Sequence, residues 1–142
     1  NEKVRFATVD MNAVPEGLGE FDFVWSVCAL EHLGSLEKGR LFLERSLELL
    51  RPGGIAVHTT EYNVSSDTET LATGSTVLYR RRDILEMAQG LWSAGHDLVV
   101  NLEAGNGPAD RQIDGPPYEG VHLKLWTAGF VATSFGFIIR KG

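Results

Sequence analysis

The stretch from Phe21 to Ser35 reads FDFVWSVCALEHLGS and places Glu31 directly before His32. An apolar run, Phe23–Val27, leads into this pair, as expected for a strand of a parallel sheet that is covered on both faces. A carboxylate and an imidazole can each take or give a proton during a reaction. Because ligands bind at the carboxyl ends of parallel strands, the sequence predicts that this strand delivers two acid–base groups to a ligand site. The alternative is that both residues simply begin the next helix, where an acid favours the helix dipole.

A second group of candidates follows the next apolar run. Residues 55–60 read IAVHTT and are predicted to form a strand, with Glu61 and Tyr62 just past its end. His58 lies inside the run, so we expect it to be a hydrogen-bonded core residue. Glu61 is a candidate base and Tyr62 a candidate substrate contact, because both are expected at the same crevice as Glu31.

The segment from Glu103 to Gly120 is a long loop, rich in Gly, Pro and Asp. Loops of this length in compact domains are often functional, so we expect a lid or substrate wall here. Tyr118 and His122 are candidate substrate contacts. Asp110 and Asp114 lie nearby, but their spacing with His122 fits no strong ligand motif, and we predict no metal site.

The elements that must position these residues alternate between strand and helix. Ser35 is a plausible N-cap for the helix that ends before Arg51, and Asp83 is predicted to cap a helix that runs to about Ala94. The expected strands are residues 4–9, 21–27, 55–60, 98–102 and 130–140. This order predicts an α/β fold with a mostly parallel sheet, closed by an antiparallel pair of C-terminal strands. The length of 142 residues suits one domain, residues 1–142.

Composition narrows the function classes. The chain is 43% hydrophobic and 23% charged, with a net charge of −6, which argues against a nucleic-acid binder that works through a broad cationic face. Cys28 is the only cysteine, which excludes an intrachain disulfide and fits a reducing cytoplasm. No apolar run reaches the roughly 18 residues that span a membrane. The chain begins at Asn1 rather than Met, and we expect it to be a piece of a longer protein.

Two motifs together resemble a known family. FDFVWSVCALEHLG ends one strand, a helix follows, and LLRPGGIAVHTT leads into the next strand. This combination resembles the C-terminal two-thirds of a class I S-adenosylmethionine-dependent methyltransferase, and is similar to the type 11 methyltransferase and cyclopropane synthase-like groups. The resemblance runs from about Val4 to Lys141 and implies part of a Rossmann-like sheet.

The resemblance assigns roles to particular residues. Asp10 matches the acidic position that bonds the cofactor's adenine amine, with Met11 beside it. Val27 matches the residue after the fourth strand whose backbone lies near the methionine end of the cofactor. Glu31 and His32 match a pair that lies at the reaction centre of the similar cyclopropane fatty acid synthases. The implied cofactor is S-adenosylmethionine, and the implied substrate is a small molecule such as a sugar, a lipid or another metabolite.

The family's glycine-rich loop and its ribose-binding acid have no counterpart, since no GxGxG occurs in this chain. Two hypotheses follow. In the first, the chain is the larger part of a methyltransferase that needs an upstream segment, with Glu31, His32 and Glu61 as candidate bases. In the second, it is a truncated or degenerate non-catalytic module that dimerises or docks on a partner. The resemblance implies two further strands upstream that are missing here. Without them the strand at 21–27 would have an unpaired edge, so we expect a homodimer or other self-association.

Overall fold

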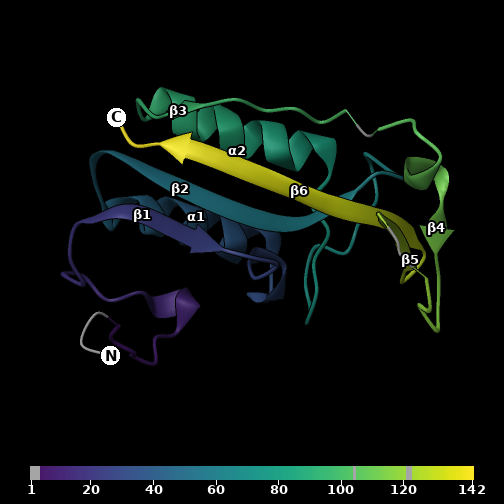
Figure 1. Cartoon of the computed structure of the whole chain (residues 1–142), viewed down its shortest axis with the longest axis horizontal. Coiled ribbons are helices and arrows are strands. Elements are labelled where there is room, and N and C mark those ends of the chain that lie inside the picture. The colour runs from purple at the N-terminus through teal and green to yellow at the C-terminus, as the bar shows by residue number, and fades with distance from the viewer. Residues whose placement is uncertain (1–3, 104, 121–122) are drawn as a thin grey trace.

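A computed structural model describes residues 4–103, 105–120 and 123–142 (Figure 1). One mixed sheet and two helices make up most of it. The strands are β1 (Phe21–Ser26), β2 (Leu50–Asn63), β3 (Asp97–Leu98), β4 (Ile113–Asp114), β5 (Lys124–Thr127) and β6 (Phe130–Arg140). The helices are α1 (Leu36–Glu48) and α2 (Arg81–Ser93), with short 3₁₀ turns η1 (Met11–Ala13), η2 (Leu30–His32) and η3 (Ala109–Arg111). Among the described residues, no helix is both long enough and apolar enough to cross a membrane.

The sheet has the strand order β1-β2-β6-β5-β4, and β3 pairs with the end of β6. The β1–β2 and β4–β5 pairs are parallel, whereas β6 runs antiparallel to β2, β3 and β5. The prediction of a mostly parallel sheet was therefore wrong. The cause is the long β6, which lies antiparallel beside β2. β6 also runs opposite to β5, to which it is joined by a tight turn at Ala128 and Gly129, both at positive φ. The expected antiparallel contact between the C-terminal strands is confirmed by the β3–β6 pair.

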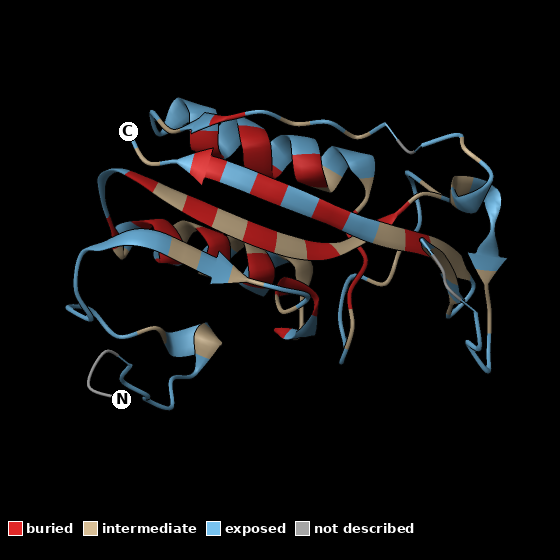
Figure 2. Ribbon diagram, in the orientation of Figure 1, coloured by how far each residue is buried: buried red, intermediate tan, exposed pale blue. Residues whose placement is uncertain are grey.

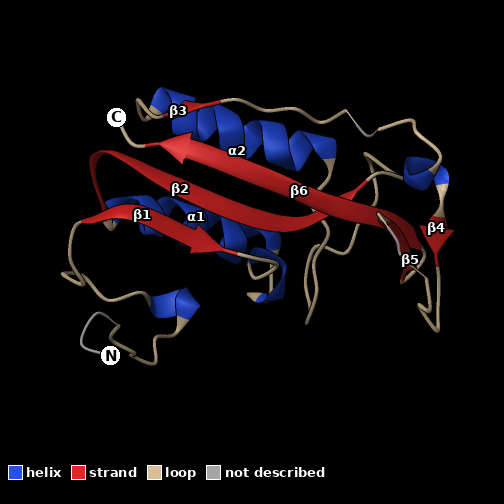
Figure 3. Cartoon of the chain, in the orientation of Figure 1, coloured by secondary structure: helices blue, strands red, loops and turns tan. Residues whose placement is uncertain are grey.

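Both helices pack on one face of the sheet, behind the strands in the view of Figure 3. Burial alternates along β2 and β6 accordingly (Figure 2). The residues turned toward the helices form one apolar core with α1 and α2, which includes Ala56, Phe135, Phe137 and Ile139. The opposite face carries Ile138, which is 63% exposed, so the helices cover only half of the sheet's surface.

The crossover from β1 to β2 through α1 follows the sequence closely. The Ser35 hydroxyl accepts a hydrogen bond from the Lys38 amide, as an N-cap should. Leu43 and Leu47 turn the apolar side of α1 into the core. β2 begins at Leu50, earlier than the strand expected at 55–60, so the strand also contains the Pro-Gly-Gly segment at 52–54.

Three local expectations were wrong. Residues 4–9 form no strand, because in the described part of the chain nothing lies beside them to complete a ladder. The predicted strand at 98–102 is reduced to Asp97–Leu98. Asp83 lies in the first turn of α2 rather than at its cap. Its carboxylate accepts hydrogen bonds from the backbone amide and the guanidinium of Arg80 at 2.8 Å, which fixes the start of the helix.

A buried polar network joins β1, β2 and α1, and confirms the expectation for His58. The Ser46 hydroxyl donates to the Leu43 carbonyl at 2.7 Å and therefore accepts from Nε2 of His58 at 2.9 Å. Nδ1 of His58 then accepts from the Ser26 hydroxyl at 2.7 Å. The ring is fully buried, and this desolvation lowers the pKa of His58 to about 4.

This neutral histidine makes stability depend on pH. Between pH 6.5 and 4 the unfolded chain binds a proton at His58 and the folded chain does not, so stability falls as the pH falls through this window and levels off below it. The shift corresponds to roughly 3 kcal/mol of unfolding free energy. Denaturant titrations of the wild type and of His58→Asn should show a shallower pH dependence for the variant. Equal slopes in the two proteins would contradict the assignment.

Gly39 on α1 makes room for the buried Tyr79. A Cβ at position 39 would lie 1.8 Å from the Tyr79 hydroxyl oxygen, whereas one at Gly90 on α2 would meet nothing within 4 Å. We expect Gly39→Ala to lower the unfolding free energy by about 1–3 kcal/mol despite alanine's higher helix propensity. Gly90→Ala, the matched control, should raise it by about 0.5–1 kcal/mol. Chemical denaturation measures both, and a stabilised Gly39→Ala would show that Tyr79 is not packed there.

Candidate functional site

The end of β1 turns sharply onto β2. Cys28 has a φ of 46°, in the left-handed region that residues other than glycine rarely adopt. Its amide donates a hydrogen bond to Oγ1 of Thr59 at 3.0 Å, which holds the turn against β2. Such strained residues are often found at functional sites. The turn leaves Val27 exposed at the carboxyl end of the strand.

Glu31 is the most buried acidic side chain of this region, with 1% of its surface exposed. The Thr60 hydroxyl donates to its Oε2 at 3.1 Å, and its carbonyl accepts from the Val77 amide at 2.9 Å. Burial is the main cause that raises the pKa of Tyr79 above its usual range, and the nearby charges of Glu31 and Asp83 add to it. Tyr79 therefore stays protonated, and the Glu31 side chain is held in place by its hydrogen bond from Thr60.

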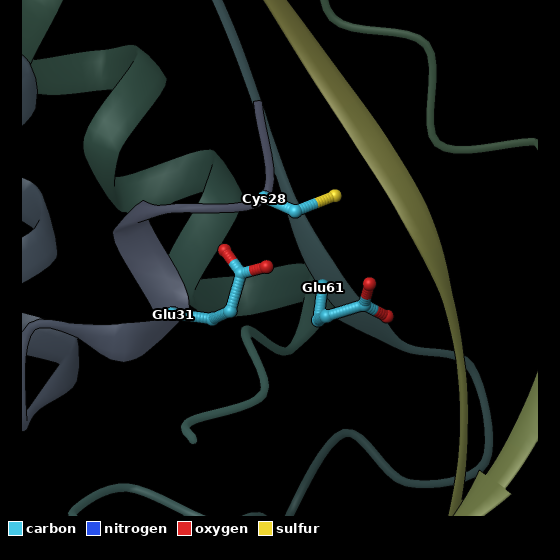
Figure 4. A group of neighbouring side chains, drawn as sticks. All are labelled: Cys28, Glu31 and Glu61. Atoms are coloured by element: carbon cyan, nitrogen blue, oxygen red, sulfur yellow. The ribbon is translucent and has the colours of Figure 1, made fainter. Parts of the chain in front are cut away.

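Three side chains from neighbouring elements converge here (Figure 4). Ligand atoms of Cys28, Glu31 and Glu61 all lie within 4.8 Å of one another. Figure 4 shows the Glu31 carboxylate turned toward Cys28, whereas the Glu61 side chain, on the adjacent β2, points away from Glu31. The sequence placed Glu61 after its strand, but β2 continues to Asn63, so Glu61 is a half-buried strand residue.

The chemistry of this cluster is that of two carboxylates beside a thiol. Such groups can take a proton from a bound hydroxyl, position a polar substrate or bind a cation. Acidic clusters also occur without an ion, and the expectation that the chain holds no metal stays a prediction. Sequence reasoning named both glutamates and missed Cys28. It placed the threonines at 59 and 60 near the crevice but gave them no role, although their positions next to Glu61 at the end of a strand were the available cue.

His32 does not join the cluster, although it follows Glu31 directly. The η2 turn sends the two side chains in different directions, and His32 is exposed. Its Nδ1 lies 2.8 Å from the carbonyl oxygen of Ser75, so this nitrogen carries the proton and donates it. The ring therefore ties η2 to the loop that crosses beside it, where the Gly74 amide also donates to the Gly34 carbonyl at 3.0 Å.

The other predicted contacts are spread over the molecule. Tyr62 is buried on the helix-covered face, with its ring centroid 6.2 Å from that of Phe135. Tyr118 is exposed, and its hydroxyl donates to the Trp126 carbonyl at 3.1 Å. His122 lies outside the described residues.

The residues expected to hold the cofactor's adenine lie away from the sheet, in the N-terminal segment. Asp10 is the N-cap of η1, and its Oδ1 accepts from the Asn12 amide at 2.9 Å. Met11 lines a hollow beside α1 with Lys38 and Phe42. Figure 1 shows the N-terminal segment below β1 and outside the sheet, and η1 packs beside α1.

Solved structures with similar folds include two of different kinds. The [4+2]-cyclase SpnF is 24% identical over 70% of this chain and 34% of its own, with a TM-score of 0.50. An O-methyltransferase family protein from Burkholderia thailandensis is 16% identical over 89% of this chain and 32% of its own, with a TM-score of 0.47. The chain thus spans about one third of the length of these proteins. No family model and no curated protein matches it.

At this identity, the match to SpnF shows a shared fold and nothing of function.

Proposed function

We propose that this chain supplies the acceptor side of an S-adenosylmethionine-dependent methyltransferase that acts on a small molecule, such as a sugar, a lipid or another metabolite. The observation that supports this most is the convergence of Glu31, Glu61 and Cys28 at the carboxyl ends of the parallel pair β1–β2. Ligands bind at this place in open α/β sheets. The sequence resemblance over residues 21–60 points to methyl transfer, and a reducing cytoplasm is the proposed location because Cys28 is the only cysteine.

The described residues fit only part of the cofactor. The exposed Val27 can flank its methionine end, and Asp10 retains one carboxylate oxygen beyond the bond to Asn12. The chain has no glycine-rich turn that would let the backbone approach the cofactor closely. The proposal therefore includes a glycine-rich segment supplied from outside residues 1–142, and this chain alone is expected to be inactive.

When bound, the cofactor supplies a methyl group already activated on a sulfonium. The chain's part is to place the acceptor and to take its proton. Glu31 is suited to this because Thr60 and the surrounding core hold its carboxylate in one position, which removes the entropic cost of orienting it. Glu61, only half-buried, can contact the acceptor from the open face of the sheet. Tyr118 in the long loop and His122, which follows it in the sequence, remain proposed substrate contacts. Tyr62 and His32 are proposed to act by supporting the site.

A cofactor titration tests the proposal on the chain as it is. We expect S-adenosylmethionine to bind with a dissociation constant of about 1 mM. A complete site would bind it at about 1 micromolar, and losing two or three contacts to a charged ligand costs roughly 4 kcal/mol of binding free energy. Amide NMR signals of Val27, Cys28 and Asn12 should shift, and those of α2 should not. Glu31→Gln should leave this affinity unchanged, whereas Asp10→Asn should weaken it.

The Glu31→Gln variant also separates cofactor binding from chemistry. With the glycine-rich segment restored, Glu31→Gln should lower turnover by about 100-fold or more, which is the usual effect of losing a general base. His32→Gln serves as the control and should have a smaller effect. Shifts absent at Val27 and Cys28 in the titration, or a Glu31→Gln variant with normal turnover, would contradict the proposal.

A non-catalytic module is the second candidate. The observation that favours it is the apolar surface of β1, where Trp25 is 62% exposed. An exposed strand with aromatic side chains suits association better than it suits methyl transfer.

A further inference from the structure

β1 is an edge strand with unusual features. It pairs with β2 only, and in the described part of the chain its other edge has no strand beside it. Phe23 and Trp25 stand on the face that the helices leave open, 51% and 62% exposed, with their rings edge to face at 6.1 Å. β4, the strand at the far end of the strand order, is only two residues long, and such short edges resist pairing.

β1 also lacks the charges and prolines that usually protect an edge. Its only ionised side chain is Asp22, which forms an ion pair with Arg51 of the neighbouring β2. Neither Lys nor Pro occurs between Phe21 and Ser26. Six residues with an unpaired backbone edge and a row of aromatic side chains make a template for another strand.

We propose that β1 is the interface between two copies of this chain, paired antiparallel about a two-fold axis at Val24. In this register Phe23 lies opposite the partner's Trp25, and Phe21 lies opposite the partner's Val27. All of these side chains have the same parity in the strand, so the aromatic pairs meet on one face, where cross-strand aromatic contacts stabilise a sheet.

Charge supports this register. It places Asp22 opposite the partner's Ser26, so no like charges face each other, and a symmetric contact of this kind is how most homodimers close. Centring the axis on Trp25 instead would shorten the overlap of the two strands. Centring it on Phe23 would keep the same overlap but would replace the Phe23–Trp25 pairs by Phe23–Phe23 and Phe21–Trp25 pairs, and would place Asp22 opposite the partner's Val24. The axis at Val24 keeps both Phe23–Trp25 pairs.

The available area suits a modest affinity. Phe21, Phe23 and Trp25 are 44%, 51% and 62% exposed. Taking about 200 Å² for each aromatic side chain, their exposed area is roughly 300 Å² per copy, which sets an upper limit of about 600 Å² for what these side chains bury in the pair. Val27 and the strand backbone bring the total toward the lower limit of about 1,000 Å² for specific interfaces, so a micromolar dissociation constant is expected. This interface does not rest on the proposed methyl transfer; it concerns residues 1–142 alone, because the upstream strands that the resemblance implies would cover the same edge.

Light scattering coupled to size exclusion tests the association. At about 100 micromolar the mass should approach twice 15.6 kDa, or about 31 kDa. Trp25→Lys should weaken dimerisation by at least about tenfold, because the charge would lie against the partner's Phe23. Ile138→Lys is the control, since Ile138 is 63% exposed on the same open face but lies on β6, and it should dimerise like the wild type.

Cysteine crosslinking tests the register without relying on a destabilising charge. In a Cys28→Ser background, Val24→Cys should form a disulfide-linked dimer, because opposed residues of antiparallel strands have Cα atoms about 4.5–5.5 Å apart. Asp22→Cys, which would face Ser26, should not. A 15.6 kDa monomer throughout, or crosslinking at position 22 and not at 24, would overturn the proposal and leave this edge to a strand of another polypeptide.

Discussion

The parallel pairing of β1 with β2 is the contact on which the rest of the structure depends. From Phe23 opposite Ile55 to Ser26 opposite His58, the two strands stay in register, and α1 connects them across the covered face. Parallel strands can be joined only by such a crossover, so the helix and both strands form one unit. The buried network of Ser26, His58 and Ser46 ties all three elements together, and each of its polar atoms has a partner.

This pairing is also what creates the candidate site. It brings the carboxyl ends of β1 and β2 to the same edge of the sheet. Two adjacent threonines of β2 then bond to the segment after β1: Thr59 accepts a hydrogen bond from the Cys28 amide, and Thr60 donates one to the carboxylate of Glu31. Glu61 follows them on the strand and completes the cluster. A shift of one residue in register would turn all three β2 side chains to the opposite faces, so the site and the fold share one constraint.

The sequence predicted the structural features that depend on neighbouring residues, but not the features that depend on contacts with residues far away in the chain. The cap at Ser35 and the core role of His58 follow from neighbouring residues, and both were confirmed. Residues 4–9 have strand composition, but a strand also needs a partner to bond its backbone. Glu31 and His32 are adjacent in the chain, and their separation depends on Thr60 and Ser75, whose approach no spacing rule could show. The mixed sheet likewise follows from where β6 docks.

Amide hydrogen exchange tests the central claim, that the end of β1 is held against β2, most directly. The Cys28 amide lies after the last residue of the strand and is protected only if Thr59 accepts its hydrogen bond. We expect it to exchange at least about tenfold more slowly than the amides of residues 4–10, and Thr59→Val to remove most of this protection. If Cys28 exchanges as fast as residues 4–10 in the wild type, the turn is not closed on β2 and the cluster of Cys28, Glu31 and Glu61 is not assembled.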